Sequence, residues 1–310
     1  MDPSPISVAP QIIMTSPTVF PIIEQAIRDA TGKGFNIRRM AAAGGGCINT
    51  AYRLEGDQCS FFVKLNRKDL LPMFEAEAEG LRGIAASCTV RAPKPVCYGV
   101  AGDQAYLAME YLTLRSGRAA ADHLLGEQLA AMHAIRQPWF GWHRDNTIGS
   151  TPQPNPRCEN WSNFWSQHRL AWQLDLAAGR GYGGRLQRAG EKLLERLPAL
   201  LAGHTPSPSL LHGDLWGGNY ACDEAGQPVV FDPACYFGDR EADLAMTELF
   251  GGFGEAFYAA YRESFPVDAG YTVRKDLYNV YHVLNHLNLF GGGYLQQAES
   301  MIARLLAEVN

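Results

Sequence analysis

Apolar residues recur at two different spacings along this chain of 310 residues, and each spacing predicts a kind of element. From Phe20 to Ala30 they recur every three or four positions, which predicts a helix that ends at Gly32. Short runs of apolar residues predict strands instead. Three such runs lie at Ser60 to Leu65, Val96 to Val100 and Ala105 to Met109. The pattern therefore predicts a sheet-containing N-terminal region.

A second helical pattern begins at Pro72 and runs to about Ala86. At 100° per residue, one face carries Glu77 together with three apolar residues, Met73, Leu81 and Ile84. The opposite face carries three charged residues, Glu75, Glu79 and Arg82. We therefore expect Glu77 to point inward with the apolar stripe.

Lys64 places a cation inside the apolar run of residues 60–65, where a charge needs a partner. An ion pair with Glu77 would satisfy both groups and would aim the ammonium at the phosphates of a nucleotide. In the alternative arrangement, Lys64 extends to solvent and Glu77 turns outward.

The segment from His212 to Asn219, His-Gly-Asp-Leu-Trp-Gly-Gly-Asn, carries the strongest chemical signal. Asp214 could take or orient the proton of an attacking hydroxyl, and Asn219 and Asp232 could hold ions that neutralise charge on a moving phosphate. One acid and one amide are too few for a closed metal cage, which favours Mg²⁺. Asp, Asn and Gly are also ordinary turn formers, so the segment alone could be a plain loop.

The residues that follow favour the chemical interpretation. Tyr220 to Cys222 and Pro228 to Phe231 are typical of two short strands around a turn at Asp223 to Gly226. Such a hairpin would return Asp232 to the side of Asn219, which a random loop has no reason to do.

Gly44, Gly45 and Gly46 form a predicted turn before a strand at Ile48 to Leu54. Glycines allow backbone amides to approach a phosphate closely. A plain hairpin turn explains the three residues equally well, and no Gly-Lys-Ser/Thr follows as in a Walker loop. Further on, Glu110 to Leu112 forms a natural connection between lobes, and the backbone of Glu110 and Leu112 could hydrogen-bond an adenine edge.

The composition limits the partners. The net charge is −5, whereas a nucleic-acid binder needs a basic surface, so no nucleic acid is expected. No apolar run approaches the length of a membrane span, so no membrane is expected either. Residues 1–16 lack the features of a signal peptide and are expected to form a flexible arm. We expect a cytoplasmic location.

The seven cysteines show neither CxxC pairs nor metal-ligand spacing. In a reducing compartment most are expected to be free thiols in small core sites. Cys47 differs because backbone amides of the glycine turn and Lys64 would favour its thiolate. Its oxidation to a sulfenic acid, or to a disulfide with a second subunit, would then block nucleotide binding reversibly. Alternatively, Cys47 is a small residue accepted in a tight turn.

Taken in order, the chain has a glycine-rich turn, a strand lysine, a helix glutamate, a connection, the His-Gly-Asp loop and a strand-end Asp. This order resembles the protein-kinase-like fold, and more closely its small-molecule branch of aminoglycoside and choline kinases. The chain is most similar to the fructosamine kinase (ketosamine-3-kinase) family, over about residues 18–310. The similar segments are GGGCIN (44–49), FVK (62–64), MFEAE (73–77), LHGDLWGGN (211–219), DPACYFGDREADLAMT (232–247), Asn285-His286 and LFGGGY (289–294).

The resemblance implies ATP-dependent phosphorylation of the 3-hydroxyl of a ketosamine. Ketosamines are the Amadori adducts, ribulosamine or fructosamine, of a sugar on an amine or a protein lysine. The family's 3-phosphates are unstable and shed the sugar, so the implied outcome is deglycation. ATP and Mg²⁺ are the implied cofactors.

Residue by residue, Asp214 matches the family's catalytic base. Asn219 and Asp232 match its metal ligands. Lys64 and Glu77 match its phosphate-positioning pair. A long activation segment is not implied, because Asp232 is followed by proline rather than by the Phe-Gly of protein kinases.

Two further residues receive roles through the resemblance. Asp243 matches the acid that braces the backbone of the catalytic loop. Trp216 is expected to line the acceptor pocket, because an indole face suits the apolar side of a sugar ring. Packing of Trp216 under the loop is the alternative.

Other features have plainer interpretations. His282 and His286 are four apart on a predicted helix, but two histidines among apolar neighbours favour packing over a metal site. His133 lies in a predicted central helix and needs no functional role. Five tryptophans could floor a substrate groove or form a helical core: Trp139, Trp142, Trp161, Trp165 and Trp172.

We predict a bilobal α+β protein of the protein-kinase-like fold. Residues 17–112 form an antiparallel sheet with one key helix and the hinge, and residues 113–310 form a larger, mostly helical lobe. The expected partner is a small or protein-linked ketosamine, and the chain is a monomer or a homodimer. The rival functions are a kinase for another small hydroxyl substrate (aminoglycoside, choline or sugar-like) and a catalytically silent, nucleotide-binding redox sensor.

Overall fold

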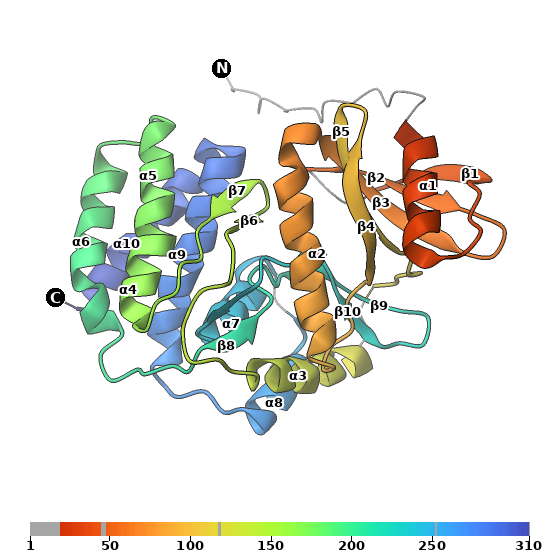
Figure 1. Cartoon of the computed structure of the whole chain (residues 1–310). Coiled ribbons are helices and arrows are strands. Elements are labelled where there is room, and N and C mark those ends of the chain that lie inside the picture. Colours follow the sequence, from red (N-terminus) through yellow and green to blue (C-terminus); the bar gives the residue numbers. More distant parts are fainter. Residues whose placement is uncertain (1–18, 45–47, 117–118, 252, 310) are drawn as a thin grey trace, which may run out of the picture. The chain divides into compact units, whose positions relative to one another are not determined.

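The computed structural model describes residues 19–44, 48–116, 119–251 and 253–309 (Figure 1). The chain divides into two compact units, residues 1–78 with 94–112 and residues 79–93 with 113–310. The expected arm at residues 1–16 lies outside the described residues, and so do Gly45, Gly46 and Cys47.

The smaller unit contains an antiparallel sheet of five strands in the order β1-β2-β3-β5-β4. Its elements are α1 (Val19–Thr31), β1 (Arg39–Ala43), β2 (Thr50–Glu55), β3 (Ser60–Arg67), η1 (Lys68–Leu70), the first half of α2 (Leu71–Ala86), β4 (Pro95–Ala101) and β5 (Gln104–Glu110). The helices and strands predicted from the apolar pattern are confirmed, within two residues at each end.

Helix α1 covers one face of this sheet. Its buried residues are Val19, Ile23 and Ile27, whose spacing of four places them on one stripe. They share a core with alternate strand residues, Leu54, Phe61, Val63, Leu65, Tyr106 and Ala108. The period-two alternation of these strands therefore selects which side chains meet the helix.

The opposite face of the sheet carries Lys64, and we call it the Lys64 face. Residues paired in register share a face, so Ala51 and Leu107 lie on it beside Lys64. The next rung of the same face holds Arg53, Phe62 and Met109. Lys64 itself is only 6% exposed, which explains why it needs a partner.

The larger unit is mainly helical, as predicted. Its helices are the second half of α2, α3 (Ala119–His133), α4 (Trp161–Trp165), η2 (Ser166–Ala171), α5 (Trp172–Gly179), α6 (Arg185–Leu200), η3 (Gly217–Asn219), α7 (Glu241–Leu249), α8 (Glu255–Ser264), α9 (Tyr271–Phe290), η4 (Gly292–Tyr294) and α10 (Leu295–Ala307). Its strands are β6 (Asn146–Ile148), β7 (Thr151–Gln153), β8 (Ser209–Leu211), β9 (Tyr220–Cys222), β10 (Pro228–Val230) and β11 (Tyr236–Gly238). Among the described residues, no helix combines the length and the apolar character needed to cross a membrane.

Two short strand pairs hold the His212–Asn219 segment in place. Strand β8 leads into the segment and pairs with β11, and β9 leads out of it and pairs with β10. Backbone bonds also join the segment to residues 231–235: Phe231 N donates to Asn219 O at 3.1 Å, and Ala234 N donates to His212 O at 2.8 Å. The predicted hairpin is therefore confirmed, with β10 ending at Val230.

The tryptophan cluster is partly core. Trp161 and Trp165 are buried and pack against Tyr278, whose hydroxyl accepts a hydrogen bond from Trp161 Nε1 at 3.0 Å. The remaining members, Trp139, Trp142 and Trp172, are half-buried. The core interpretation therefore holds for the two tryptophans of α4.

Helix α2 is buried on more than one face. Glu79, on the side away from the apolar stripe, is bound by His143 at 2.9 Å and by Arg144 at 3.0 Å. A Cβ added to the neighbouring Gly80 would lie 3.3 Å from Cys235 Sγ. The second half of α2 thus packs within the larger unit, and the division between the units falls inside this helix.

The cysteine prediction is only half right. The six described cysteines are all free thiols, as expected. Only Cys222 and Cys235 are buried, whereas Cys59 and Cys88 are exposed, so the expectation that most fill core sites is wrong. Cys59 lies at the β2–β3 turn and Cys88 follows the end of α2, positions whose exposure is set by the fold.

Candidate active site

Asp243 braces the start of the His212–Asn219 segment. It lies in the first turn of α7 and is 1% exposed. Its two carboxylate oxygens accept hydrogen bonds from the backbone N–H groups of His212, at 2.7 Å, and Gly213, at 2.8 Å. The bracing contact expected for Asp243 is therefore confirmed.

Asp243 is itself held by a residue that the sequence analysis left without a role. His133, fully buried at the end of α3, lies with Nε2 3.1 Å from Asp243 Oδ2 and with Nδ1 2.7 Å from the hydroxyl of Tyr261. Burial acts to raise the pKa of Asp243, but hydrogen bonding and charge from His133, followed by His212, outweigh it and keep that pKa below its usual range. His133 is thus a positioning residue. No local sequence signal could have shown this, because its partner lies 110 residues away.

Gly213 is required by a close approach of two backbones. Its φ is +82°, and an added Cβ would lie 2.1 Å from the carbonyl oxygen of Ala234. A larger residue would therefore push apart the two segments that carry Asp214 and Asp232.

His212 is held as a neutral ring under the loop. Its Nε2 lies 3.0 Å from the carbonyl oxygen of Phe231, which can only accept, so Nε2 carries the proton. Nδ1 then accepts from the backbone N–H of Asp214 at 3.3 Å. Burial lowers the pKa of His212, which agrees with this neutral state.

Asp214 and Asn219 face each other across the loop. The Asn219 amide nitrogen donates to the Asp214 backbone oxygen at 2.9 Å and to its carboxylate oxygen Oδ2 at 3.2 Å. Asn219 is 6% exposed and begins the hairpin that returns to Asp232. These bonds fix the Asp214 carboxyl and leave the Asn219 side-chain oxygen as the atom suited to a cation.

The carboxyl of Asp214 is unusually basic. Burial and then the charge of Asp232 raise its pKa from 3.8 to about 7, against the opposing hydrogen bond from Asn219. The charge of Asp232 thus contributes to the raised pKa of Asp214. A carboxyl that titrates near neutral pH is suited to accept a proton during catalysis.

Asp232 has a backbone conformation that few non-glycine residues adopt. Its φ is +56°, and it is one of two described non-glycine residues with positive φ. Asp tolerates this region better than most residues, yet such outliers concentrate at functional sites. The residues on either side of Asp232, Phe231 and Ala234, bond through their backbone N–H groups to Asn219 and His212.

The oxygen donors in this loop fit a magnesium ion. Asn219 and Asp232 offer an amide oxygen and a carboxylate, hard ligands that leave room for water and phosphate oxygens. The raised pKa of Asp214 fits as well, because a cation would relieve its repulsion with Asp232. Mg²⁺ prefers oxygen ligands, so these side chains fit it without a nitrogen or sulfur ligand.

Trp216 lies at the exposed side of the same loop. Its side chain is 39% exposed and meets the ring of Phe250 edge-on, with the centroids 6.4 Å apart. An added Cβ on Gly218 would lie 2.3 Å from the indole, so the ring covers the loop backbone. One side of the ring thus packs on the loop, and part of the ring stays accessible. The expected role of Trp216 in an acceptor pocket stays a prediction.

In the smaller unit, the predicted ion pair is confirmed. Lys64 Nζ lies 2.6 Å from Glu77 Oε1, and both side chains are about nine-tenths buried. Lys64 comes from the centre of β3 and Glu77 from the first half of α2. The pair fixes the ammonium on the Lys64 face.

The glycine turn is described only at its edges. Gly44 directly follows β1, and an added Cβ there would meet nothing within 4 Å. On the far side, Asn66 donates through its amide to Ile48 O at 3.1 Å and to Asn49 Oδ1 at 2.7 Å. Asn66 thus anchors the strand end that follows the turn, a role the sequence analysis missed.

Glu110 closes the end of β5. Its backbone N–H donates to Lys94 O, and its carboxylate accepts from Lys94 N, both at 2.9 Å. Leu112, two residues further, is half-buried. The adenine contacts expected of Glu110 and Leu112 stay a prediction. The convergence of Lys64 with Asp214, Asn219 and Asp232 around one nucleotide also stays a prediction.

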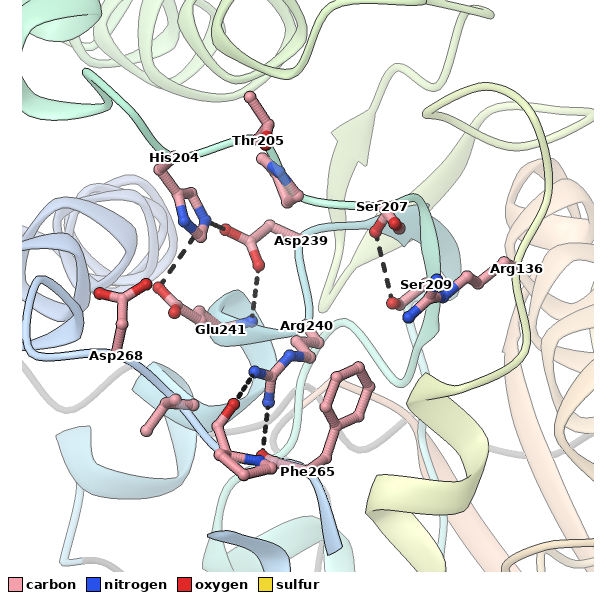
Figure 2. Close-up of a pocket in the computed structure, with 13 residues that line it drawn as sticks. Arg136, His204, Thr205, Ser207, Ser209, Asp239, Arg240, Glu241, Phe265 and Asp268 are labelled. Atoms are coloured by element: carbon pink, nitrogen blue, oxygen red, sulfur yellow. Dashed lines mark hydrogen bonds and ion pairs between the residues drawn. The ribbon is translucent and has the colours of Figure 1, made fainter.

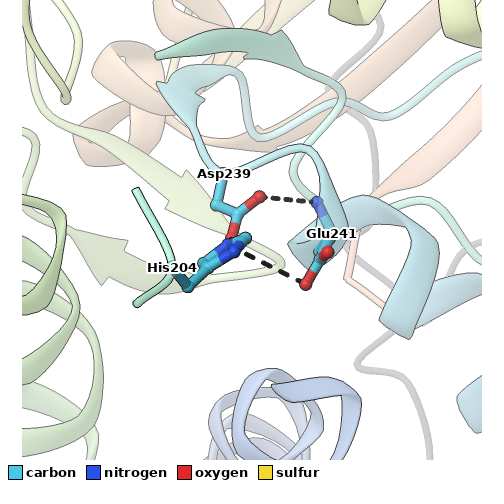
Figure 3. Close-up of side chains that lie close together, drawn as sticks. All are labelled: His204, Asp239 and Glu241. Atoms are coloured by element: carbon cyan, nitrogen blue, oxygen red, sulfur yellow. Dashed lines mark hydrogen bonds and ion pairs between the residues drawn. The ribbon is translucent and has the colours of Figure 1, made fainter. Parts of the chain in front are cut away.

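A second cluster of charged residues lies at the other end of the β8–β11 pair. It borders a cavity of about 430 Å³ lined by His204, Asp239, Arg240, Glu241 and others (Figure 2). Figure 3 shows Asp239 and Glu241 turned toward His204. Ligand atoms of these three residues lie within 4.8 Å of one another, the spacing of a metal site.

The acids of this cluster already have partners. Arg274 donates to both oxygens of Glu241, at 2.6 and 2.8 Å. Asp239 receives the hydroxyl of Tyr278 at 2.5 Å and lies 2.6 Å from His204 Nε2. A metal ion would have to displace Arg274, so we assign the cluster a structural role.

The two histidines of α9 are packing residues, as the sequence analysis favoured. His282 is 3% exposed, and burial lowers its pKa to about 3. His286 Nδ1 lies 2.8 Å from the backbone oxygen of His282. Among the described residues, neither belongs to a group of three metal-ligating side chains.

The profile of the fructosamine kinase family matches residues 19–308. The chain belongs to the fructosamine kinase family. Its enzyme class is therefore that of an ATP-dependent phosphotransferase with a hydroxyl group as acceptor. The resemblance seen in the sequence motifs is confirmed.

Two relatives illustrate the similarity in sequence. A probable ketoamine kinase from Synechocystis is 46% identical over 299 residues, covering 94% of this chain and 99% of the relative. A chloroplastic protein-ribulosamine 3-kinase from Arabidopsis thaliana is 43% identical over 274 residues, covering 87% of this chain and 83% of the relative.

Solved structures agree with the predicted fold. A crystal structure from Haemophilus somnus, assigned as a fructosamine-3-kinase, superposes with a TM-score of 0.86 at 28% identity, covering 93% of this chain and 98% of the other. The aminoglycoside phosphotransferase APH(4)-Ia superposes with a TM-score of 0.59 at 14% identity, covering 92% and 98%. The second similarity concerns the fold alone, and together they confirm the protein-kinase-like α+β fold class.

Proposed function

We propose that this family member transfers the γ-phosphate of ATP to the 3-hydroxyl of a ketosamine. The observation that carries the proposal is the geometry of Asp214, which is fixed by Asn219 and whose pKa is raised to about 7 beside Asp232. Such a carboxyl is matched to an acceptor hydroxyl at neutral pH.

In the proposed reaction, the acceptor oxygen attacks the γ-phosphorus and the bond from that phosphorus to ADP breaks. Asp214 receives the proton that the hydroxyl loses. Its pKa favours both the ionised state before transfer and the protonated state after it. Asp243 braces the start of the loop through its hydrogen bonds from the backbone of His212 and Gly213. Most of the rate then comes from positioning.

We assign the nucleotide to the Lys64 face and to the segment that follows β5. Lys64, held by Glu77 at 2.6 Å, is the cation suited to the phosphates of ATP. The glycine turn at residues 44–46 and the backbone of Glu110 and Leu112 are assigned to the phosphates and the adenine. Asn219 and Asp232 would hold Mg²⁺, which neutralises charge on the phosphates when it is bound.

The acceptor is assigned to the side of the loop that carries Trp216. A half-exposed indole offers a flat apolar surface to a sugar ring. The ketosamine class comes from the relatives, one named as a ketoamine kinase and one as a protein-ribulosamine 3-kinase. The product would be a ketosamine 3-phosphate, which sheds its sugar and frees the amine.

The partner and location proposals are less specific. The acceptor is a ketosamine, either free or linked to a protein lysine, and a cytoplasmic location is retained as a proposal. The six described cysteines, which are free thiols, are compatible with a reducing compartment. Both a monomer and a homodimer are compatible with the proposed chemistry.

An acceptor panel tests the proposal. Ribulosamine- and fructosamine-modified lysine, an aminoglycoside, choline and a sugar alcohol are incubated with the protein, ATP and Mg²⁺. Mass spectrometry should show addition of one phosphate to a ketosamine only, followed by loss of the sugar. Phosphate on choline or on the aminoglycoside instead would replace the proposed substrate with the rival one. Nucleotide binding without any phosphorylated acceptor would favour the silent sensor.

A further inference from the structure

A stacked pair of side chains lies beside the proposed nucleotide site. The guanidinium carbon of Arg53 is 4.3 Å from the centre of the Tyr111 ring, within the range of a cation–π contact. Arg53 belongs to β2, and Tyr111 lies in the connecting segment directly after β5. The two residues are 58 positions apart, so only the fold brings them together.

The strand register places Arg53 on the Lys64 face. Arg53 pairs with Phe62, and Phe62 pairs with Met109, which makes one rung of that face. Lys64 lies on the next rung, about 7 Å along the strand, since two residues of a strand rise by that distance. Met109 is followed directly by Glu110, so the Arg53 rung lies between Lys64 and the segment assigned to adenine.

The contacts of Arg53 fix the plane of its guanidinium. One nitrogen is 3.5 Å from the Tyr111 hydroxyl, and Nε lies 3.3 Å from Glu55 Oε1. The buried Nε nevertheless has no hydrogen-bond partner. The side chain is 38% exposed. The group is thus held by stacking and charge, and part of it remains available to a ligand.

We propose that Arg53, backed by Tyr111, is a shelf on which the purine base of the nucleotide stacks. This inference rests on the proposed function, because it requires phosphates at Lys64 and a base near Glu110 and Leu112. A guanidinium is flat and can lie between two aromatic faces, with Tyr111 on one side and the base on the other. A lysine has the same charge but no plane, so it cannot take this role.

Stacking on a base and hydrogen bonding to its edge predict different preferences among nucleotides. An arginine that reads an edge discriminates between bases, because it donates to particular acceptors such as those of guanine. A stacking shelf accepts any purine, since every base has a flat face. Arg53 should therefore contribute to the affinity for ATP and GTP alike, and should leave the affinity for inorganic tripolyphosphate unchanged.

The test measures binding rather than catalysis. Dissociation constants for ATP, GTP and tripolyphosphate with Mg²⁺ are measured by calorimetry for wild type, Arg53→Met, Arg53→Lys, Tyr111→Leu and Tyr111→Phe. Arg53→Met, Arg53→Lys and Tyr111→Leu should each bind both nucleotides about tenfold more weakly, which corresponds to about 1.4 kcal/mol. Tyr111→Phe keeps the ring and should bind like wild type. Tripolyphosphate should bind all five proteins equally.

The matched control is Arg38→Met. Arg38 belongs to the same unit and pairs with Asp57 at 2.9 Å, with both side chains 62% exposed, so the variant removes the same charge from a surface pair. It should bind both nucleotides like wild type. A Tm within a few degrees of wild type shows that each variant is folded, and an Arg53 variant that fails this criterion is replaced by Tyr111→Leu.

Three outcomes would overturn the shelf: unchanged nucleotide affinity in Arg53→Met, full rescue by Arg53→Lys, or a loss confined to one base. Failure of the proposed function looks different. Wild type that binds nucleotide but phosphorylates no ketosamine refutes the proposed acceptor and leaves the shelf measurable. Wild type that binds no nucleotide refutes both.

Discussion

The β8–β11 strand pair carries a cluster of acidic side chains at each of its two ends. At one end, the chain runs from Leu211 into the loop of Asp214 and arrives at Tyr236 from Asp232. At the other end, Ser209 pairs with Gly238, and the neighbouring residues include His204, Asp239 and Glu241. The two ends share one scaffold but differ in the partners of their carboxyl groups.

The charges at the His204 end are satisfied within the protein. Glu241 has a two-pronged bond from Arg274, and Asp239 has His204 and the hydroxyl of Tyr278. Burial acts to lower the pKa of His204, but its hydrogen bond to Asp239 and the charges of Asp239 and Glu241 outweigh it and raise that pKa. This end resembles a structural ion-pair network.

At the other end, Asp214 has a different kind of partner. Asp214 is bonded by the neutral amide of Asn219, and among the described residues no cation lies in a salt bridge with it. Its neighbour Asp232 carries the same charge and raises its pKa. An acid whose pKa is strongly raised by its surroundings and by a neighbouring carboxylate is typical of a functional site. The comparison therefore favours the Asp214 end as the candidate active site and the His204 end as a structural cluster, a distinction that acidity and cavity volume do not make.

The largest expected effect is the loss of catalysis in Asp214→Asn. Removal of the proposed proton acceptor should lower kcat by about 10²–10⁴, equivalent to about 3–5 kcal/mol of barrier. Phosphate transfer to fructosamine-modified lysine, measured under saturating ATP, checks this. Asp175→Asn, an exposed carboxyl of α5, serves as the control and should keep full activity. A kcat for Asp214→Asn within tenfold of wild type would exclude Asp214 as the base.

The same variant should not lose stability. The pKa of Asp214 is raised in the folded state, so the stabilising protonated form is present below pH 3.8 and is lost as pH rises through about 7. Asparagine never ionises. Asp214→Asn should therefore unfold at a higher Tm than wild type at pH 8 without Mg²⁺, and at a similar Tm at pH 4.

At the His204 end, substitution of an acid should lower the stability of the fold. Glu241→Gln leaves Arg274 buried with only half of its charge partners, which should cost about 3–5 kcal/mol of unfolding free energy. Urea denaturation at pH 7 measures the loss. Glu248→Gln is the control, because its pair with Lys275 is 2.7 Å long but partly exposed, and its loss should stay below about 1 kcal/mol. Equal losses in both variants would show that burial does not distinguish the two pairs.

The repulsion between Asp214 and Asp232 can be tested directly. Asp232→Asn removes the charge that, after burial, does most to raise the pKa of Asp214, so that pKa should fall below its value of about 7. Carbon NMR of the labelled carboxyl group, without nucleotide or metal, follows the titration. In wild type, kcat/KM should rise with pH through about 7, because the base must be ionised to accept a proton. An Asp214 midpoint unmoved by Asp232→Asn would show that burial alone sets it.

The smallest effect is expected for His204→Gln. The raised pKa of His204 means that its stabilisation is fully present below its ordinary value of 6.5 and is lost as pH rises through the higher folded value. The variant should therefore lose about 1 kcal/mol at pH 6 and less at pH 9. Chemical denaturation at the two pH values gives the difference. A loss that grows with pH would contradict a protonated His204.

Many elements of this protein could be predicted from the sequence, because they depend on residues that are close together in the chain. The period of apolar residues determined α1, α2 and the strands of the smaller unit, because a helix or a strand repeats within a few residues. The same period predicted that Glu77 points inward. Because Lys64 lies in an apolar strand and needs a partner, the ion pair with Glu77 could also be predicted. The segment from His212 to Asn219 could also be recognised without distant information, because Asp214, Asn219 and their glycines are contiguous.

Partners that are distant in sequence were decided only by the tertiary structure. His133 has no feature in its own segment that points to Asp243, and Arg53 has none that points to Tyr111. Glu241 looked like one more acid until the fold placed Arg274 against it, whereas among the described residues Asp214 is bonded by the neutral amide of Asn219. Sequence periodicity tells which face a side chain occupies, but packing of separate elements determines what lies opposite that face. Because the energy of a buried charge depends on that neighbour, only the tertiary structure decided which acids are paired with a buried cation.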